Sequence, residues 1–383
     1  MKIYLFYHSI ISGWNHGNAH FLRGITRELL QRGHDVKVFE PRDNWSLSNL
    51  KQDVGDEVAA NFFNVFPDFQ NIVYFYDPHV FQPQTYLQDA ELVIVHEWNE
   101  PHLVKTMGDY RKIKDFILLF HDTHHRSVTA PEEMRRYDLT HYDGVLAFGN
   151  VIRDLYLQNQ WAKSAWTWHE AADTALFKPT KEKVKKKGDL VWIGNWGDEE
   201  RSEELHKFLI EPIKELKLNA TFYGVRYPEK ALKALKKANI IYGGFLPNYK
   251  VPEIFHQYQV TVHVPRRPYV QALPGIPTIR PFEAMACGIP LICSPWEDTE
   301  GLFTSGKDYL VAHNKKDMKK HLKKLLNKSE KAEKLAKSGW KTIKKRHTCK
   351  HRVDELMEII TTLQGKSTDL TLKSNNTPSN KTK

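Results

Sequence analysis

The chain has 383 residues, of which 41% are hydrophobic and 27% charged, and its formal net charge is +10. This balance is that of a globular protein and excludes a wholly disordered or collagen-like chain; the length suits about two domains. The positive charge is local, because residues 313–352 hold 16 Lys or Arg and three acidic residues, which leaves −3 on the remainder. Any partner that requires basic charge is therefore expected at the C-terminal segment.

The cysteines and the N-terminus indicate a reducing compartment. There are three cysteines, Cys287, Cys293 and Cys349, and no C-x-x-C pair, so neither a disulfide framework nor a cysteine zinc site is expected. Residues 2–7 form a short apolar run without a following cleavage site, which predicts a strand and not a signal peptide. No run approaches the roughly 20 apolar residues of a membrane span. We expect a cytoplasmic protein.

The first half of the chain alternates short apolar runs with helical patterns. Phe21, Leu22, Ile25 and Leu29 share one face of a predicted helix over 18–32, and Gly33 ends it. Most of the runs are apolar on both faces, as in strands buried between two helix layers. The predicted strands are 2–7, 35–40, 91–96, 115–121, 143–148 and 165–169.

A Lys-rich stretch at 178–188 interrupts this alternation and predicts a linker, after which the pattern starts again. Helices are expected at about 201–217, 228–238 and 281–287, and the chain reads as helical after 313. The second set of predicted strands is 189–194, 219–224, 239–244, 260–265, 289–294 and 308–312.

Two sets of strand–helix units divided by a linker predict an α/β protein with two doubly wound, Rossmann-like domains that face a cleft. Its functional loops should follow the carboxyl ends of the strands. The expected divisions are an N-terminal domain at 1–175, a C-terminal domain at 176–345, a terminal helix at 346–364 that could cross back to the first domain, and a disordered tail at 365–383.

The loop after the first strand is the first candidate site. Gly13 and Gly17 let the backbone approach a ligand, and with Asn18 they precede the N-terminus of the helix over 18–32, where free N–H groups attract an anion. The spacing is not G-x-G-x-x-G, so a dinucleotide fingerprint is absent. The alternative is a glycine-bearing turn without function.

Two further candidates follow buried strands of the first domain. His96 ends one strand and could donate to a sugar hydroxyl or move a proton; the alternative is a satisfied strand-end histidine. Asp122 lies in the stretch F-H-D-T-H-H-R, at 120–126. Its three histidines suggest a metal site, but a further ligand is unclear, so we favour a polar cleft wall.

The second domain offers a glycine turn and a carboxylate. Gly194 and Asn195 precede Arg201, which could pair with a diphosphate. Residues 198–200 are acids, which would repel a phosphate placed too near, and the alternative is that they are only helix N-terminal partners. The segment R-P-F-E-A-M-A-C-G-I-P-L-I contains Arg280 and Glu283. Glu283 at a strand–helix junction is suited to accept both ribose hydroxyls of a nucleotide, and the alternative is a helix-dipole partner.

These motifs together resemble those of GT-B-fold glycosyltransferases of group 1 (family 4-like), and more narrowly the spore-maturation-protein-like (CgeB-like) branch. The resemblance covers residues 1 to about 360, and F-E-A-M-A-C-G-I-P-L-I is its strongest mark. It implies that Glu283 holds the donor ribose, that His96 contacts the transferred sugar, and that the loop 13–18 binds acceptor and donor phosphate. Residues 168–179 are similar to the family's interdomain connection. The resemblance implies that 1–175 is the acceptor-side domain and 176–345 the nucleotide-sugar-binding domain.

The resemblance implies transfer of a sugar from a nucleotide-sugar donor to an unidentified acceptor, with retention, by a hexosyltransferase-type enzyme. No D-x-D occurs, and neither a cofactor nor a metal is expected. The chain departs from the pattern at Gly275, eight residues before Glu283, where the family has a second glutamate. Arg201 and Arg280 could replace the family's basic pair, and His96 and Asp122 are the candidate catalytic groups.

Three other functions remain open on the same fold. They are a DNA-base sugar transferase, a sugar-nucleotide epimerase and an inactive nucleotide-sugar-binding protein. Nucleic-acid readout has little support, since the basic segment contains only Trp340 as an aromatic residue. That segment, 313–352, could also bind an anionic inner membrane surface peripherally, and the alternative is a solvated Lys-rich face.

Overall fold

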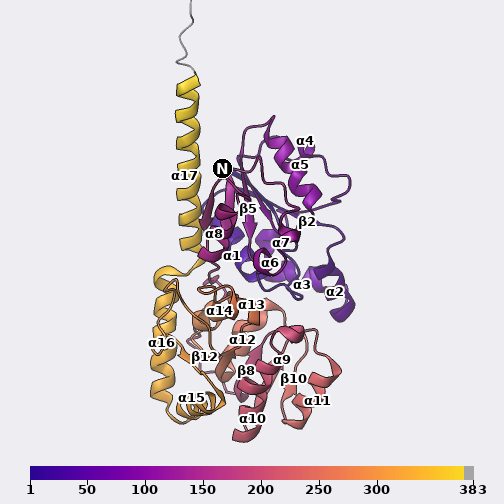
Figure 1. Cartoon of the computed structure of the whole chain (residues 1–383). Coiled ribbons are helices and arrows are strands. Elements are labelled where there is room, and N and C mark those ends of the chain that lie inside the picture. The colour runs from indigo at the N-terminus through magenta and orange to yellow at the C-terminus, as the bar shows by residue number, and fades with distance from the viewer. Residues whose placement is uncertain (375–383) are drawn as a thin grey trace, which may run out of the picture.

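The computed structural model describes residues 1–374 and shows two parallel β-sheets, one above the other in Figure 1. The first sheet has the strand order β3-β2-β1-β4-β5-β6-β7 and the second β10-β9-β8-β11-β12-β13. Every strand pair in both sheets is parallel, so each connection crosses over a face of its sheet. The prediction of two doubly wound α/β units is confirmed.

The first sheet is buried on both faces. Alternate residues of one strand enter different cores: Leu92 and Ile94 pack with α1, whereas Val93 and Val95 pack with α5. Its strands are β1 Lys2–Phe6, β2 Asp35–Pro41, β3 Val73–Tyr76, β4 Leu92–His96, β5 Ile117–Asp122, β6 Gly144–Ala147 and β7 Ala165–Thr167. Its helices are α1 Ala19–Gln31, α2 Trp45–Val54, α3 Val58–Val65, α4 Pro83–Tyr86, α5 Pro101–Arg111, α6 Arg126–Thr129, α7 Pro131–Met134 and α8 Asn150–Gln158, with a 3₁₀ turn η1 at Pro67–Phe69.

The second sheet is covered in the same way. Its strands are β8 Gly188–Ile193, β9 Ala220–Tyr223, β10 Ile241–Tyr242, β11 Tyr258–His263, β12 Leu291–Cys293 and β13 Leu310–Val311. Its helical elements are η2 Asp198–Glu200, α9 Ser202–Leu205, the π-helical η3 His206–Ile210, α10 Glu211–Leu216, α11 Glu229–Lys237, η4 Asn248–Lys250, α12 Val251–His256, α13 Arg267–Gln271, α14 Ile279–Cys287, α15 Lys315–Asn327 and α16 Ser329–Arg346. Each strand predicted from the sequence corresponds to a strand of one of the two sheets. The first sheet also contains β3, which was not predicted.

The last helix, α17 at Cys349–Ser374, lies along the first sheet's helices (Figure 1). It contacts α1, and the Cys349 N–H donates to the Ala172 carbonyl at 3.0 Å. The chain therefore returns from the second unit to the first. Part of the segment expected as a disordered tail is the end of this helix, and residues 375–383 lie outside the described residues.

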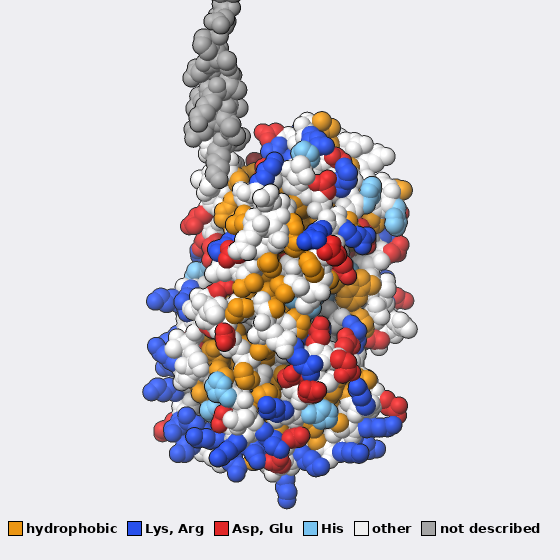
Figure 2. All heavy atoms as spheres, in the orientation of Figure 1, with side chains coloured by type: hydrophobic (Ala, Val, Ile, Leu, Met, Phe, Trp, Pro, Cys, Tyr) orange, Lys and Arg blue, Asp and Glu red, His pale blue; other side chains and the backbone are white. Residues whose placement is uncertain are grey.

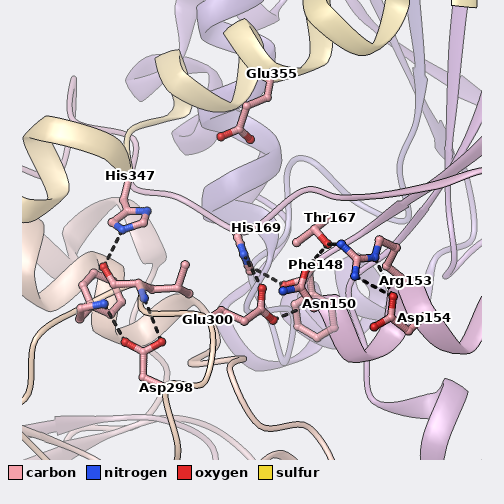
Figure 3. A network of polar contacts seen from close by, with 12 residues as sticks. Phe148, Asn150, Arg153, Asp154, Thr167, His169, Asp298, Glu300, His347 and Glu355 are labelled. Atoms are coloured by element: carbon pink, nitrogen blue, oxygen red, sulfur yellow. Dashed lines mark hydrogen bonds and ion pairs between the residues drawn. The ribbon is translucent and has the colours of Figure 1, made fainter. Parts of the chain in front are cut away.

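Ionic contacts join the two units near the connection between them (Figure 3). His169 Nε2 lies 2.9 Å from the Glu300 carboxylate, which also accepts the Asn150 N–H at 2.8 Å. The other ring nitrogen of His169 donates to the Phe148 carbonyl at 3.1 Å. Glu300 follows β12 of the second sheet, whereas Asn150 begins α8 of the first, so these contacts fix the connection to both.

The Lys-rich helices form the end of the second unit. Figure 2 shows Lys and Arg side chains gathered at the lower end and along α16. Some of this charge is neutralised, since Lys315 lies 2.7 Å from Glu211 of α10 and Lys319 pairs with Glu215. Within residues 1–374, no helix is both long enough and apolar enough to cross a membrane.

Candidate active site

A cavity of about 420 Å³ opens between the two units. Its first wall consists of segments that follow β1, β2, β4, β5 and β6, and its second of loops that follow β8, β9 and β11, with the start of α14. All of these loops are at the carboxyl ends of parallel strands, the place where doubly wound sheets bind ligands. The cavity is thus the site at which both units can hold one molecule.

The glycine loop after β1 closes one end of this cavity. Gly17 and Asn18 line it, and Gly13 lines an adjoining hollow of about 80 Å³. A Cβ on Gly17 would lie 3.6 Å from Ile279 of α14, so the backbone here approaches the second unit closely. Asn18 does not cap α1 with its side chain; its amide donates to Thr123 in the loop after β5.

The turn after β8 meets the glycine loop across the cavity. Gly194 and Asn195 both line it, and the Asn195 amide donates to the side-chain oxygen of Asn15. The side-chain oxygen of Asn195 in turn accepts a hydrogen bond from the Val225 N–H at 2.9 Å. Gly197 has φ +84°, a left-handed conformation that favours glycine and turns the chain toward α9.

Four arginines give the second wall positive charge. Arg226, Arg266 and Arg280 each pair with a carboxylate, whereas Arg201 has no ion-pair partner among the described residues. The Arg201 guanidinium donates to the carbonyls of Trp196 and Val264 at 3.2 and 3.0 Å, and lies over the Trp192 ring. Burial lowers the pKa of Arg201 to about 9, so it stays protonated at neutral pH.

The acids of the turn after β8 each form an ion pair with a basic side chain. Asp198 pairs with Arg226, Glu200 with Arg266 at 3.0 Å, and Glu199 with Lys230 at 2.9 Å. Each acid is therefore compensated, and the charge of Arg201 remains for a ligand.

Glu283 of α14 lies behind the cavity wall. It is 0% exposed and pairs with Arg280, while its other oxygen accepts from Asn248 at 2.7 Å and lies 3.3 Å from His20 Nδ1. Burial raises the pKa of the Glu283 carboxyl, an effect that Arg280 opposes. A ribose would reach Glu283 only by displacing Arg280 or Asn248, both of which line the cavity hollows.

His96 and Asp122, the expected catalytic groups, are fully buried and do not line the cavity. His96 lies between Glu97 at 2.8 Å and the Thr123 hydroxyl at 3.1 Å. Asp122 accepts the Tyr156 hydroxyl at 3.0 Å. Burial lowers the pKa of His96 to about 3 and raises that of Asp122 to about 7. They support the loops that form the wall, with Thr123 between them and the cavity.

Glu170, in the connection between the units, is the functional candidate that sequence reasoning missed. It is 2% exposed, lines the cavity, and neither carboxyl oxygen has a hydrogen-bond partner among the described residues. Burial raises its pKa well above the usual value, and the nearby Glu283 and Glu97 add to this. The sequence did offer one signal for Glu170, namely an acid within the connecting segment 168–179. That it lines the cavity follows only from the fold.

Three histidines line the first wall, beside two asparagines and a threonine. His16, His124 and His125 line the cavity, and burial lowers the pKa of each. Among the residues that the structure describes, the His, Cys, Asp and Glu side chains form no group arranged to hold a metal ion. His124 and His125 instead pack ring against ring, 4.0 Å apart.

Residues 201–358 match the profile of a family described as glycosyl transferase-like. Solved structures match over the whole chain. HepE of Anabaena in complex with UDP-glucose has a TM-score of 0.66 and 13% identity, covering 94% of this chain and 100% of that one. The fold is GT-B.

Other GT-B structures are similar to the same extent. Sucrose-phosphate synthase from Thermosynechococcus elongatus has a TM-score of 0.64 and 14% identity, covering 95% and 99% of the two chains. An alpha-glucosyltransferase in complex with UDP and a 13-mer DNA containing an HMU base has a TM-score of 0.64 and 12% identity, covering 94% and 99%. A sequence comparison with curated proteins gives no significant match.

Proposed function

We propose that this protein is a glycosyltransferase that binds a nucleotide-sugar donor in the cavity between its two GT-B units. The observation that carries the proposal is the position of Arg201: its guanidinium has no ion-pair partner among the described residues and is held by backbone carbonyls, in the turn between β8 and α9. A guanidinium in this setting is suited to a diphosphate. The similar structures contain UDP or UDP-glucose, which supports a nucleotide-sugar as the ligand.

The donor can be placed by charge. Its diphosphate would lie against Arg201, with Arg280 and the Gly194 turn, and its ribose would engage Glu283, as the resemblance to group 1 enzymes implies. Glu170 would then face the sugar, where its unpartnered carboxyl can bind hydroxyl groups. We choose Glu170 for this role over His96 because only Glu170 lines the cavity.

The reaction follows from these positions. The acceptor hydroxyl oxygen bonds to the anomeric carbon while the bond from that carbon to the phosphate oxygen breaks. The diphosphate leaves with the electron pair and takes up the acceptor proton, and Arg201 stabilises its charge. The two units exclude water that would hydrolyse the donor. We also propose retention, which the anomeric proton coupling in the product's NMR spectrum would reveal.

A thermal-shift panel of UDP, GDP, dTDP and their sugar conjugates tests the proposal. We expect one nucleotide class to raise the melting temperature of the wild type and to lose most of this effect in Arg201→Gln. Arg267→Gln is the matched control, because Arg267 pairs with Glu204 and does not line the cavity. Equal shifts in the wild type and in Arg201→Gln would contradict the role of Arg201.

The same panel distinguishes the contribution of the sugar to binding from that of the nucleotide. In Glu170→Gln we expect the shift from the free nucleoside diphosphate to persist, while the additional shift from the attached sugar is lost. A residue that only maintained the fold would affect both ligands equally. Loss of the nucleotide shift in Glu170→Gln would therefore assign Glu170 to the structure of the site and not to the sugar.

A further inference from the structure

The two walls of the cavity differ in charge. The second wall carries Arg201, Arg226, Arg266 and Arg280. The loops of the first sheet contribute no Lys, Arg, Asp or Glu side chain to the first wall among its described residues; Glu170, which also lines the cavity, lies in the connection between the units. The polar side chains of the first wall are asparagines, histidines and Thr123, and its aromatic ones include Trp45 and Trp98. Because burial lowers the pKa of its histidines, this wall is uncharged at neutral pH.

Two tryptophans present their rings on the uncharged wall. Trp45, the first residue of α2, is 37% exposed, and its ring lies 6.4 Å from that of Trp98 at an interplanar angle of 70°. Such large apolar side chains are normally buried, and both of these line a cavity filled with polar groups. They are surfaces for a ligand that has both apolar and hydroxyl-bearing faces.

Neighbouring side chains of the first unit hold the two indole rings in place. The buried His8 ring lies 4.8 Å from Trp45 at an angle of 31°, and the Trp14 ring meets Trp45 edge-on at 6.0 Å. The Arg126 guanidinium covers Trp98 at 4.1 Å. Trp14 is itself fixed by a hydrogen bond from Nε1 to Asp53 at 2.5 Å. A pre-ordered surface of this kind loses little conformational entropy when a ligand binds.

We propose that Trp45 and Trp98 form the acceptor subsite, and that the acceptor is an uncharged saccharide whose ring stacks on an indole. This inference rests on the glycosyl transfer proposed above. A pyranose ring has an apolar C–H face that an indole buries, and its hydroxyls can bond to Asn18, Thr123 and the neutral histidines. A nucleic-acid acceptor would require cationic contacts for its phosphates, and among the described residues no Lys or Arg of the first unit lines the cavity.

Saturation-transfer NMR on the full chain tests the subsite directly. The probes are lactose, maltose, cellobiose and chitobiose, with sialyllactose as the charged counterpart of lactose and a 13-base-pair duplex DNA. Saturating aromatic protons should transfer to the C–H face of at least one neutral saccharide and to neither charged probe. The transfer should be lost in Trp45→Ala and kept in Trp45→Phe. Trp161→Ala is the matched control, since Trp161 lines a separate hollow of the first unit.

Turnover gives the second measurement. With a neutral acceptor, Trp45→Ala should raise the acceptor KM about tenfold or more, whereas the control Trp161→Ala should leave the acceptor KM, donor hydrolysis without acceptor and nucleotide affinity unchanged. Binding of the DNA or of sialyllactose in preference to neutral sugars, or an unchanged KM in both Trp45→Ala and Trp98→Ala, would overturn the subsite. If no nucleotide-sugar binds or reacts, glycosyl transfer itself fails, and saccharide binding at Trp45 alone decides the subsite.

Discussion

Asp122 shows how burial makes the stability of this protein depend on pH, because burial raises the pKa of its carboxyl group. Its carboxyl is 0% exposed, and burial raises its pKa from 3.8 to about 7. Between these values the folded protein keeps a proton that the unfolded chain releases, so the contribution of Asp122 to stability is full below pH 4 and is lost as the pH rises to 7. The contribution of Asp122 alone therefore makes the folded protein more stable in mild acid than at neutral pH.

Asp122→Asn should remove this pH dependence. The amide resembles the protonated acid and can keep the contacts to Tyr156 and to the His124 N–H. Each pKa unit corresponds to about 1.4 kcal/mol, so between pH 5 and pH 8 the wild type should lose roughly 2–3 kcal/mol more unfolding free energy than the variant. Urea unfolding at the two pH values measures this. Parallel losses in both proteins would show that Asp122 is ionised throughout.

At the scale of elements, the contact of α1 with α17 depends on Gly24. A Cβ there would lie 2.4 Å from Cys349 Sγ and 2.8 Å from the Asp173 Cβ, and neither group can withdraw in a packed interior. Gly24→Ala should therefore lower the free energy of unfolding by about 1–3 kcal/mol, despite the better helix propensity of alanine.

Gly108→Ala is the matched control for this prediction. Gly108 is also helical, in α5, but a Cβ there would meet its nearest neighbours at an ordinary 3.6 Å. The variant should be neutral or more stable by about 0.5–1 kcal/mol. Chemical denaturation of both variants compares them. A similar effect at both positions would mean that α17 is not closely packed on α1 in solution.

The elements that sequence could predict are those with a physical signature of their own. Strands such as β4 and β5 are apolar on both faces because helices cover both, and this pattern placed them within one or two residues. β3 at Val73–Tyr76 lacks the pattern, since Tyr74 and Phe75 are 42% and 40% exposed at the sheet edge. An edge strand buries too little to be read from hydrophobicity alone.

Some residues of the candidate site could likewise be predicted from the sequence and others could not. Glycine turns such as Gly17 and Gly194 could be found from the sequence, because their position after a strand determines where they lie. The direction of a strand-end side chain could not. His96 and Asp122 end their strands beside the cavity yet point into packed interior, whereas Glu170 lies in an irregular segment whose path depends on contacts from both units.

At the scale of the whole molecule, the two units are joined by the connection at 168–187 and by the return of α17. These meet at Arg352, whose side chain is 3% exposed. Its guanidinium donates to the His169 carbonyl at 2.9 Å and contacts His347 Nδ1 at 3.0 Å, and its own carbonyl accepts from Trp168 at 2.8 Å. One residue of the last helix thus holds both ends of the second unit against the first.

Arg352→Gln should loosen this junction. Glutamine cannot reach all of the partners, so buried acceptors at His169 and His347 lose their donors, and we expect a loss of about 2–4 kcal/mol of unfolding free energy. Lys350→Gln, two residues away, is the control: Lys350 is 65% exposed and pairs with Asp354, which predicts a change below about 0.5 kcal/mol. Calorimetry should also show whether the units still melt together. A single unfolding transition at the wild-type temperature in Arg352→Gln would mean that the cavity is maintained by the contacts across it and not by the helix behind it.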